Sequence, residues 1–164
     1  VLLDAHQRTT HQLPGVDESI DNLSPEQRLR SFVHFFLQHI FEKGKRAWQM
    51  KLMLQEMANP TRAMDVLVQQ IIRPRAEFLF SIVRELTGNK VPPEKVRLFA
   101  ISVIGQCVHV CLAQPVIMRL NPDIKYEPAD VEMLADHITR FSLAAIRTLS
   151  QSYEDEGDAD EKTN

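Results

Sequence analysis

The chain has few glycines and few cysteines, and it lacks a strong positive charge. Among its 164 residues are only 5 glycines, and they form neither a phosphate-binding loop nor the Gly-x-Ser-x-Gly turn of a serine hydrolase. The formal net charge of -3 is opposite in sign to that of a surface that binds DNA or RNA directly. The composition therefore indicates neither nucleotide chemistry nor direct contact with a phosphate backbone.

Residue types that bind metals or catalyse reactions are present, but not at the spacing such chemistry needs. No His-Glu-x-x-His pattern occurs. Cys107 and Cys111 lie one helical turn apart, and His109 falls on a different side, so a metal site would need ligands from elsewhere. Helix geometry also disfavours a disulfide between these cysteines, which fits a reduced cytoplasmic protein. We expect no metal, no cofactor, no catalytic residue and no enzymatic activity.

Apolar residues recur at steps of three and four along the chain, which is the period of helices rather than of strands. We therefore expect an all-α bundle of about six helices and no sheet. The expected helices cover residues 1–12, 24–44, 45–58, 61–87, 92–120 and 128–149. Pro74 and Pro115 fall inside two of these helices, and each predicts a bend rather than an end because proline lacks an N–H donor.

The run over residues 98–113 contains no charged side chain and is apolar on every side. It is shorter than a bilayer span and contains Gln106, so it predicts a buried helix rather than a membrane segment. Such a helix must be covered on several faces at once. One face can meet the chain's own core, while the face around Gly105 allows close approach of another backbone.

This pattern predicts a homodimer in which the two long C-terminal helices of each copy form a four-helix bundle. The expected interface residues are Ile101, Gly105, Val108, His109 and Leu112 on the apolar helix, and Leu134, Ile138, Phe141 and Ala145 on the last helix.

The two ends of the sequence differ from its middle. Residues 151–164 are mostly acidic and have little to bury, so they predict a disordered tail after a single domain over residues 1–150. No signal peptide is visible, because the apolar start is followed at once by Asp4. Since the chain begins with Val1 rather than Met, we expect a further segment upstream.

Two polar features inside the apolar pattern have more than one interpretation. Arg73-Pro74-Arg75 is either a site for an anionic ligand or two solvated arginines beside a helix bend, and the sequence favours the second. Gln106 needs a hydrogen-bond partner if it is buried, and that partner is either a ligand or a neighbouring helix.

Several short motifs in this order are similar to those of a known family. They are Ser-Pro-Glu-Gln at 24–27, Leu-Gln-Glu-Met-Ala-Asn-Pro-Thr at 54–61, Ile-Arg-Pro at 72–74, Ile-Gly-Gln-Cys at 104–107 and Leu-Ala-Asp-His-Ile-Thr-Arg-Phe at 134–141. Together they make the chain resemble, over residues 1–150, the C-terminal regulatory domain of TetR/AcrR-type transcriptional repressors.

The resemblance implies a cytoplasmic homodimer with a cavity among its middle helices for a small hydrophobic or amphipathic ligand. Operator DNA would be bound only through an N-terminal helix-turn-helix domain, which residues upstream of Val1 would supply. For the cavity we expect Trp48, Met53, Met57, Phe78, Phe99, Gln106 and Cys107, chosen for apolar character or an inward polar group. The alternative function is a helical adaptor that binds a partner protein through the exposed apolar face.

Overall fold

The computed structural model describes residues 22–41 and 53–161, with side chains described up to Tyr153. These residues form helices and connecting turns without a strand, which confirms the all-α prediction. The elements are α3 (Pro25–Phe41), α5 (Arg62–Leu67), the π-helix η1 (Val68–Ile72), α6 (Arg73–Leu86), α7 (Pro93–Leu120) and α8 (Pro128–Glu161). Residues 53–58 are also helical. The helix expected over residues 1–12 and the segment 42–52 lie outside the described residues.

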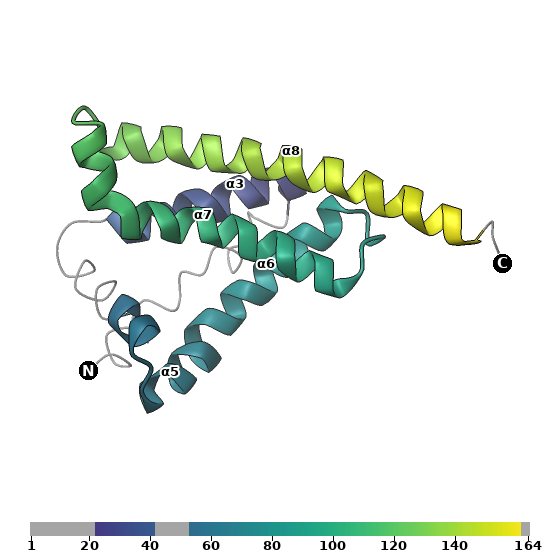
Figure 1. Cartoon of the computed structure of the whole chain (residues 1–164), viewed down its shortest axis with the longest axis horizontal. Coiled ribbons are helices and arrows are strands. Elements are labelled where there is room, and N and C mark those ends of the chain that lie inside the picture. The colour runs from purple at the N-terminus through teal and green to yellow at the C-terminus, as the bar shows by residue number, and fades with distance from the viewer. Residues whose placement is uncertain (1–21, 42–52, 162–164) are drawn as a thin grey trace.

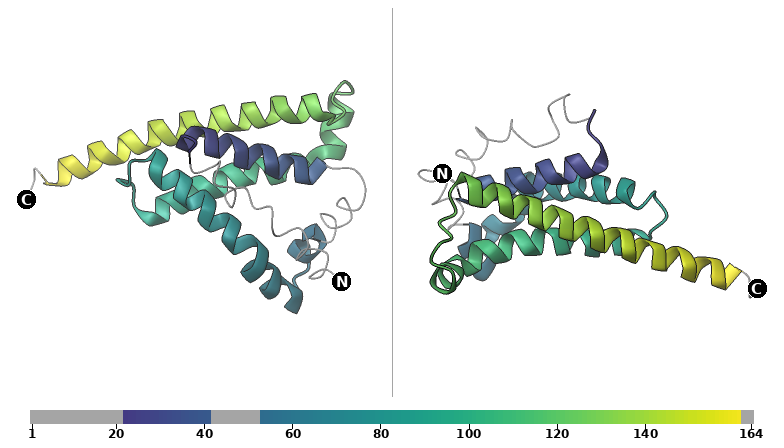
Figure 2. Two further views of the ribbon diagram at one scale, coloured as in Figure 1. Left: turned by 180° about the vertical axis from the view of Figure 1, so that it is seen from behind. Right: turned by 90° about the horizontal axis from the view of Figure 1, so that it is seen from above.

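The helices pack into a bundle in which α7 and α8 lie on one side and α3 and α6 on the other. Figure 1 is seen from the side of α7 and α8, which run next to each other in opposite directions. From behind, α3 and α6 lie in front of them (Figure 2). Helix α3 packs against α6, α7 and α8. It is therefore central to the bundle, although α7 and α8 are both longer.

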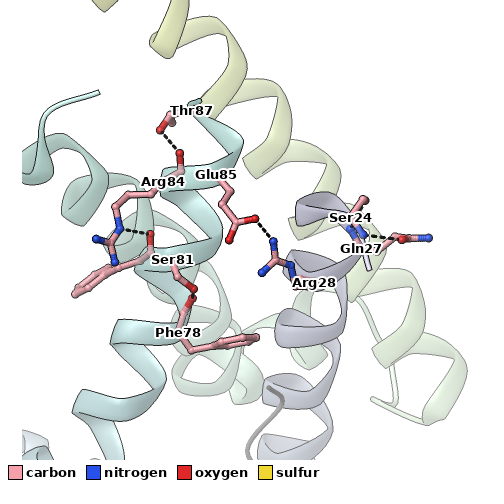
Figure 3. Close-up of polar contacts among 9 residues, drawn as sticks. Ser24, Gln27, Arg28, Phe78, Ser81, Arg84, Glu85 and Thr87 are labelled. Carbon is pink, nitrogen blue, oxygen red and sulfur yellow. Dashed lines mark hydrogen bonds and ion pairs between the residues drawn. The ribbon is translucent and has the colours of Figure 1, made fainter. Parts of the chain in front are cut away.

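The start of α3 follows from the Ser-x-x-Gln sequence at residues 24–27, which forms a capping box. The backbone N–H of Ser24 donates to Gln27 Oε1 at 2.9 Å, and the N–H of Gln27 donates to Ser24 Oγ at 3.3 Å (Figure 3). These two bonds satisfy N–H groups that have no partner within the helix. The N-terminus of α3 is thus set by local sequence.

The core lies where α3 meets α6, α7 and α8. Its least exposed side chains come from all four helices and include Leu29, Val33, Leu37, Ile82, Val83, Val103, Cys107 and Ala135. Ion pairs surround this core: Arg28 of α3 pairs with Glu85 of α6 (Figure 3), and Arg30 pairs with Glu132 and Asp136 of α8. The ion pairs of Arg30 are about half exposed and contribute little stability, whereas the Arg28 side chain is only 13% exposed. Apolar burial is the main stabilising contribution to the bundle.

The junction between residues 53–58 and α5 explains the Glu-x-x-x-Pro-Thr motif. The Glu56 carboxylate accepts from the Thr61 N–H at 3.1 Å and from the Thr61 hydroxyl at 3.0 Å. Thr61 Oγ in turn accepts from the Ala63 N–H at 3.1 Å and caps α5. The motif therefore links residues 53–58 to α5 by hydrogen bonds on either side of Pro60.

The helix from Arg62 to Leu86 continues through Pro74, as predicted. The turn before Pro74 is the π-helix η1, in which the Arg73 N–H donates to the Val68 carbonyl. A wider turn at this point accommodates the missing N–H and the proline ring.

Helix α7 also continues through its proline, Pro115, to Leu120, and its last turns bend toward the start of α8 (Figure 1). By length and hydropathy alone, α7 could cross a membrane, a test that core helices of soluble proteins also pass. Its packing against α3, α6 and α8 identifies it as a helix of the bundle.

The end of α8 differs from the prediction. The backbone remains helical to Glu161 rather than ending near Leu149, so residues 151–161 are helical where composition predicted a disordered tail. Tyr153 provides a physical reason, because its ring lies 6.4 Å from the Phe99 ring and 5.0 Å below the Lys95 ammonium nitrogen. These contacts anchor α8 beyond Leu149 and let it continue.

Candidate functional site

A cavity of about 180 Å³ lies between α3, residues 53–57, the η1–α6 junction and α7. The described residues that line it are almost all apolar. They are Phe32, Phe36, Ile40, Met53, Leu54, Met57, Ile71, Ile72, Arg75, Ala76, Ile104, Val108 and Cys111.

Helical periodicity brings these side chains together. Phe32, Phe36 and Ile40 recur every four residues and form one row along α3. Ile104, Val108 and Cys111 form a corresponding row on α7. Both rows lie beside the buried core face of their helix, so the cavity continues the core rather than opening a separate groove.

Arg75 is the exception among the described lining residues, because it carries a charge. It follows Ile71 by one turn, is partly buried, and its pKa is lowered because burial removes water from the charged guanidinium. No hydrogen bond or ion pair links Arg75 to another described residue. Arg73, two positions earlier, is exposed and donates from Nε to Gln69 Oε1 at 3.0 Å. The two arginines flanking Pro74 thus occupy different environments.

Of the residues expected in a pocket, Met53 and Met57 line this cavity and Trp48 lies outside the described residues. The others lie elsewhere in the described part of the chain. Phe99 and Cys107 are core residues, 7% and 0% exposed. Phe78 packs against the core with its ring 6.2 Å from that of Phe32.

Gln106 is directed to the neighbouring helix: its Nε2 donates to Ser142 Oγ of α8 at 3.2 Å. The neighbouring-helix interpretation of this polar group is therefore the one that the geometry supports. The sequence reasoning missed Ile104, Val108 and Cys111 as one lining row, although their four- and three-residue spacing could have indicated it.

Burial disfavours the thiolate form of both cysteines of α7. It raises the pKa of Cys107 to about 12, and it also raises the pKa of the partly exposed Cys111, because the thiolate would lose its hydration. Neither cysteine therefore has the lowered pKa of a catalytic nucleophile, although Cys111 is accessible to an alkylating reagent.

A second feature is a set of exposed large apolar side chains on α7 and α8, here termed the apolar stripe. Large apolar side chains scattered singly are ordinary, but a row of them at helical spacing marks an interaction surface. The stripe consists of Leu98, Ile101, Leu112 and Val116 on α7 and Met133, Phe141 and Leu149 on α8.

The expected interface residues fall into four environments: the stripe, positions beside it, the cavity and the core. Ile101, Leu112 and Phe141 belong to the stripe, with Ile101 63% and Phe141 60% exposed. Exposed Gly105 and His109 lie between the α7 members, and a Cβ placed on Gly105 would meet nothing within 4 Å in this protomer.

Leu134 and Ala145 are partly buried beside the stripe, while Val108 lines the cavity. Ile138 requires a correction, because it is 2% exposed and packs in the protomer's own core with Ala135. Its side chain therefore cannot contact a partner as predicted.

A family model described as the C-terminal domain of the HTH-type transcriptional dual regulator CecR matches residues 25–146. The match begins with α3, includes the cavity-lining rows of α3 and α7, and ends within α8. No curated protein matches the chain.

Proposed function

Because the chain belongs to the family of CecR C-terminal domains, and is thus the regulatory domain of a TetR-type transcriptional regulator, we propose that it senses a small molecule and forms a homodimer. The family membership confirms the resemblance stated from the sequence motifs and implies a cytoplasmic location. Sensing and dimerisation are inferred from the cavity and the apolar stripe. In this proposal residues 1–150 act as one ligand-binding and dimerisation domain.

The observation that carries the proposal is the position of α7. One face of this helix lines the cavity through Ile104 and Val108, and a neighbouring face carries Ile101 and Leu112 of the stripe. A ligand that enters the cavity must contact the first face. Because packed helices move as rigid units, displacement of α7 would carry the second face with it.

A movement of α7 within one protomer would then change the arrangement of the dimer. If two copies associate through their stripes, a shift of α7 changes the angle between the copies. In a TetR-type regulator this angle sets the separation of the two helix-turn-helix domains. A ligand controls that separation only to the extent that it binds the two arrangements with different affinity.

A helical adaptor is the alternative, and it would use the same stripe for a different protein. It would leave the cavity and its lining rows without a function. The presence of the cavity therefore favours the sensor.

Dimerisation is tested by size-exclusion chromatography with light scattering on the chain. We expect a dimer for the wild type and a monomer for the double variant Ile101→Glu, Phe141→Glu. Two carboxylates placed in an apolar interface should raise the dissociation constant at least about a hundredfold.

The matched control is Gln70→Glu, which adds the same kind of charge at an exposed position of η1 outside the stripe. It should remain dimeric. A wild-type chain that stays monomeric at tens of micromolar would contradict the dimer, and dissociation by the control variant would show a general charge effect instead.

A further inference from the structure

We propose that the ligand of the cavity is an amphipathic organic anion, whose carboxylate or phosphate group pairs with Arg75 while a short apolar body lies between α3 and α7. This inference rests on the proposed sensor function and names the chemistry of its ligand.

Arg75 differs in character from the side chains around it. The other described side chains around the cavity, such as Phe36, Ile104 and Val108, are apolar. A cation among such neighbours loses hydration and is costly unless an anion or a set of acceptors replaces the water.

No group among the described residues supplies an anion to Arg75. The nearby segment 53–58 contains Glu56, but its carboxylate accepts from the Thr61 N–H and hydroxyl. No hydrogen bond or ion pair to Arg75 is formed within the described residues. The guanidinium is therefore available to a ligand.

Arg73, which belongs to the same short motif, has a different environment. Its guanidinium is exposed and bonded to Gln69 within its own helix, as expected of a solvated arginine. Arg75 differs in burial, in neighbours and in lacking such a bond. The general basic character of the motif therefore does not account for an arginine at the cavity wall.

The size of the cavity restricts the apolar part of the ligand. Its volume of about 180 Å³ is only slightly larger than the roughly 150 Å³ of a protein cavity that admits benzene. One aromatic ring or a short alkyl chain fits without rearrangement. A guanidinium binds carboxylate and phosphate through paired hydrogen bonds, so either headgroup suits this site.

The experiment compares three probes that share one chain and differ in headgroup: octanoate, octanamide and monooctyl phosphate. Binding to the full chain is measured by titration calorimetry. Protection of Cys111 from iodoacetamide reports occupancy, because its side chain borders the cavity. The variants are Arg75→Gln and Arg75→Lys, and Arg73→Gln is the matched control.

Wild type should bind octanoate or the phosphate at least about tenfold more tightly than octanamide, the gain typical of a charge-assisted hydrogen bond. Arg75→Gln should abolish this preference, and Arg73→Gln should keep it. Comparison of the two anions identifies the preferred headgroup. If Arg75→Gln does not fold, Arg75→Lys decides, because loss of the paired geometry should still reduce the preference at least about threefold.

Three outcomes would overturn the inference. An anion preference that survives in the Arg75 variants would assign it to another group. Equal binding of octanoate and octanamide, with Cys111 protected, would leave the sensor proposal standing but make its ligand neutral. If no probe bound and Cys111 reacted at an unchanged rate, the ligand-sensing proposal would fail as well.

Discussion

Cys107 and Cys111 lie one turn apart on α7 and occupy two different regions of the molecule. Cys107 is 0% exposed and belongs to the packed core formed by α3, α6, α7 and α8. Cys111 is partly exposed at the cavity. The same helix thus packs in the core at one position and borders the cavity one turn later.

The same contrast extends across the bundle. On the core side, Leu29, Val33 and Leu37 of α3 are 0% exposed. On the cavity side, Met57 is 52% and Ile72 is 37% exposed. Burial of a large aliphatic side chain contributes about 1.5–3 kcal/mol, so most stability comes from the core side. Elements that respond to ligands are commonly drawn from the less stable part of a fold.

The largest expected effect of this difference is on thiol reactivity. At pH 8, iodoacetamide should modify Cys111 at least about a thousandfold faster than Cys107. The Cys107 thiol becomes accessible only when the core unfolds, which costs about 5 kcal/mol or more. The Cys107 pKa of about 12 slows its reaction further, because little thiolate forms. Mass spectrometry of digested samples over time measures both rates, and comparable rates would refute the distinction between the two regions.

A smaller effect is expected from truncating one side chain in each region. Leu29→Ala should lower the free energy of unfolding by about 2–5 kcal/mol, because it leaves a void among fully buried neighbours. Met57→Ala, at the half-exposed cavity rim, should lower it by under about 1 kcal/mol. Urea unfolding followed by circular dichroism compares the two. Equal losses would mean that the cavity side is as tightly packed as the core.

The smallest effect concerns the hydrogen bonds that Thr61 forms with Glu56 and with the Ala63 N–H at the start of α5. Thr61→Ala removes the N-cap and the contacts with Glu56, so the unfolding free energy should fall by about 1 kcal/mol. Thr61→Ser retains the hydroxyl and should stay close to wild type. The amide hydrogen-exchange rate should rise in residues 53–67 while α3 keeps its protection. An equal rise over the whole chain would contradict a cavity side that is separate in stability from the core.

The sequence predicted more of the fold than of the cavity. The start of a helix at Ser24, the continuation through Pro74 and the order of the described helices are all confirmed. Met53 and Met57 were expected at a pocket and line the cavity, whereas Phe99 and Cys107 were expected there and are core residues. Apolar character identifies side chains that avoid water, but core and cavity walls share that character.

Local sequence by itself determined where helices begin, which residues share a face of each helix, and the motifs by which the family is recognised. These features depend on backbone hydrogen bonds and on a repeat of 3.6 residues, both of which act over short distances. Only the tertiary structure decided that Ile138 faces the core, that Ile101 faces outward, and that Arg75 rather than Arg73 borders the cavity. The repeat sets the angle between side chains on one helix, whereas the environment of each face depends on residues distant in the chain.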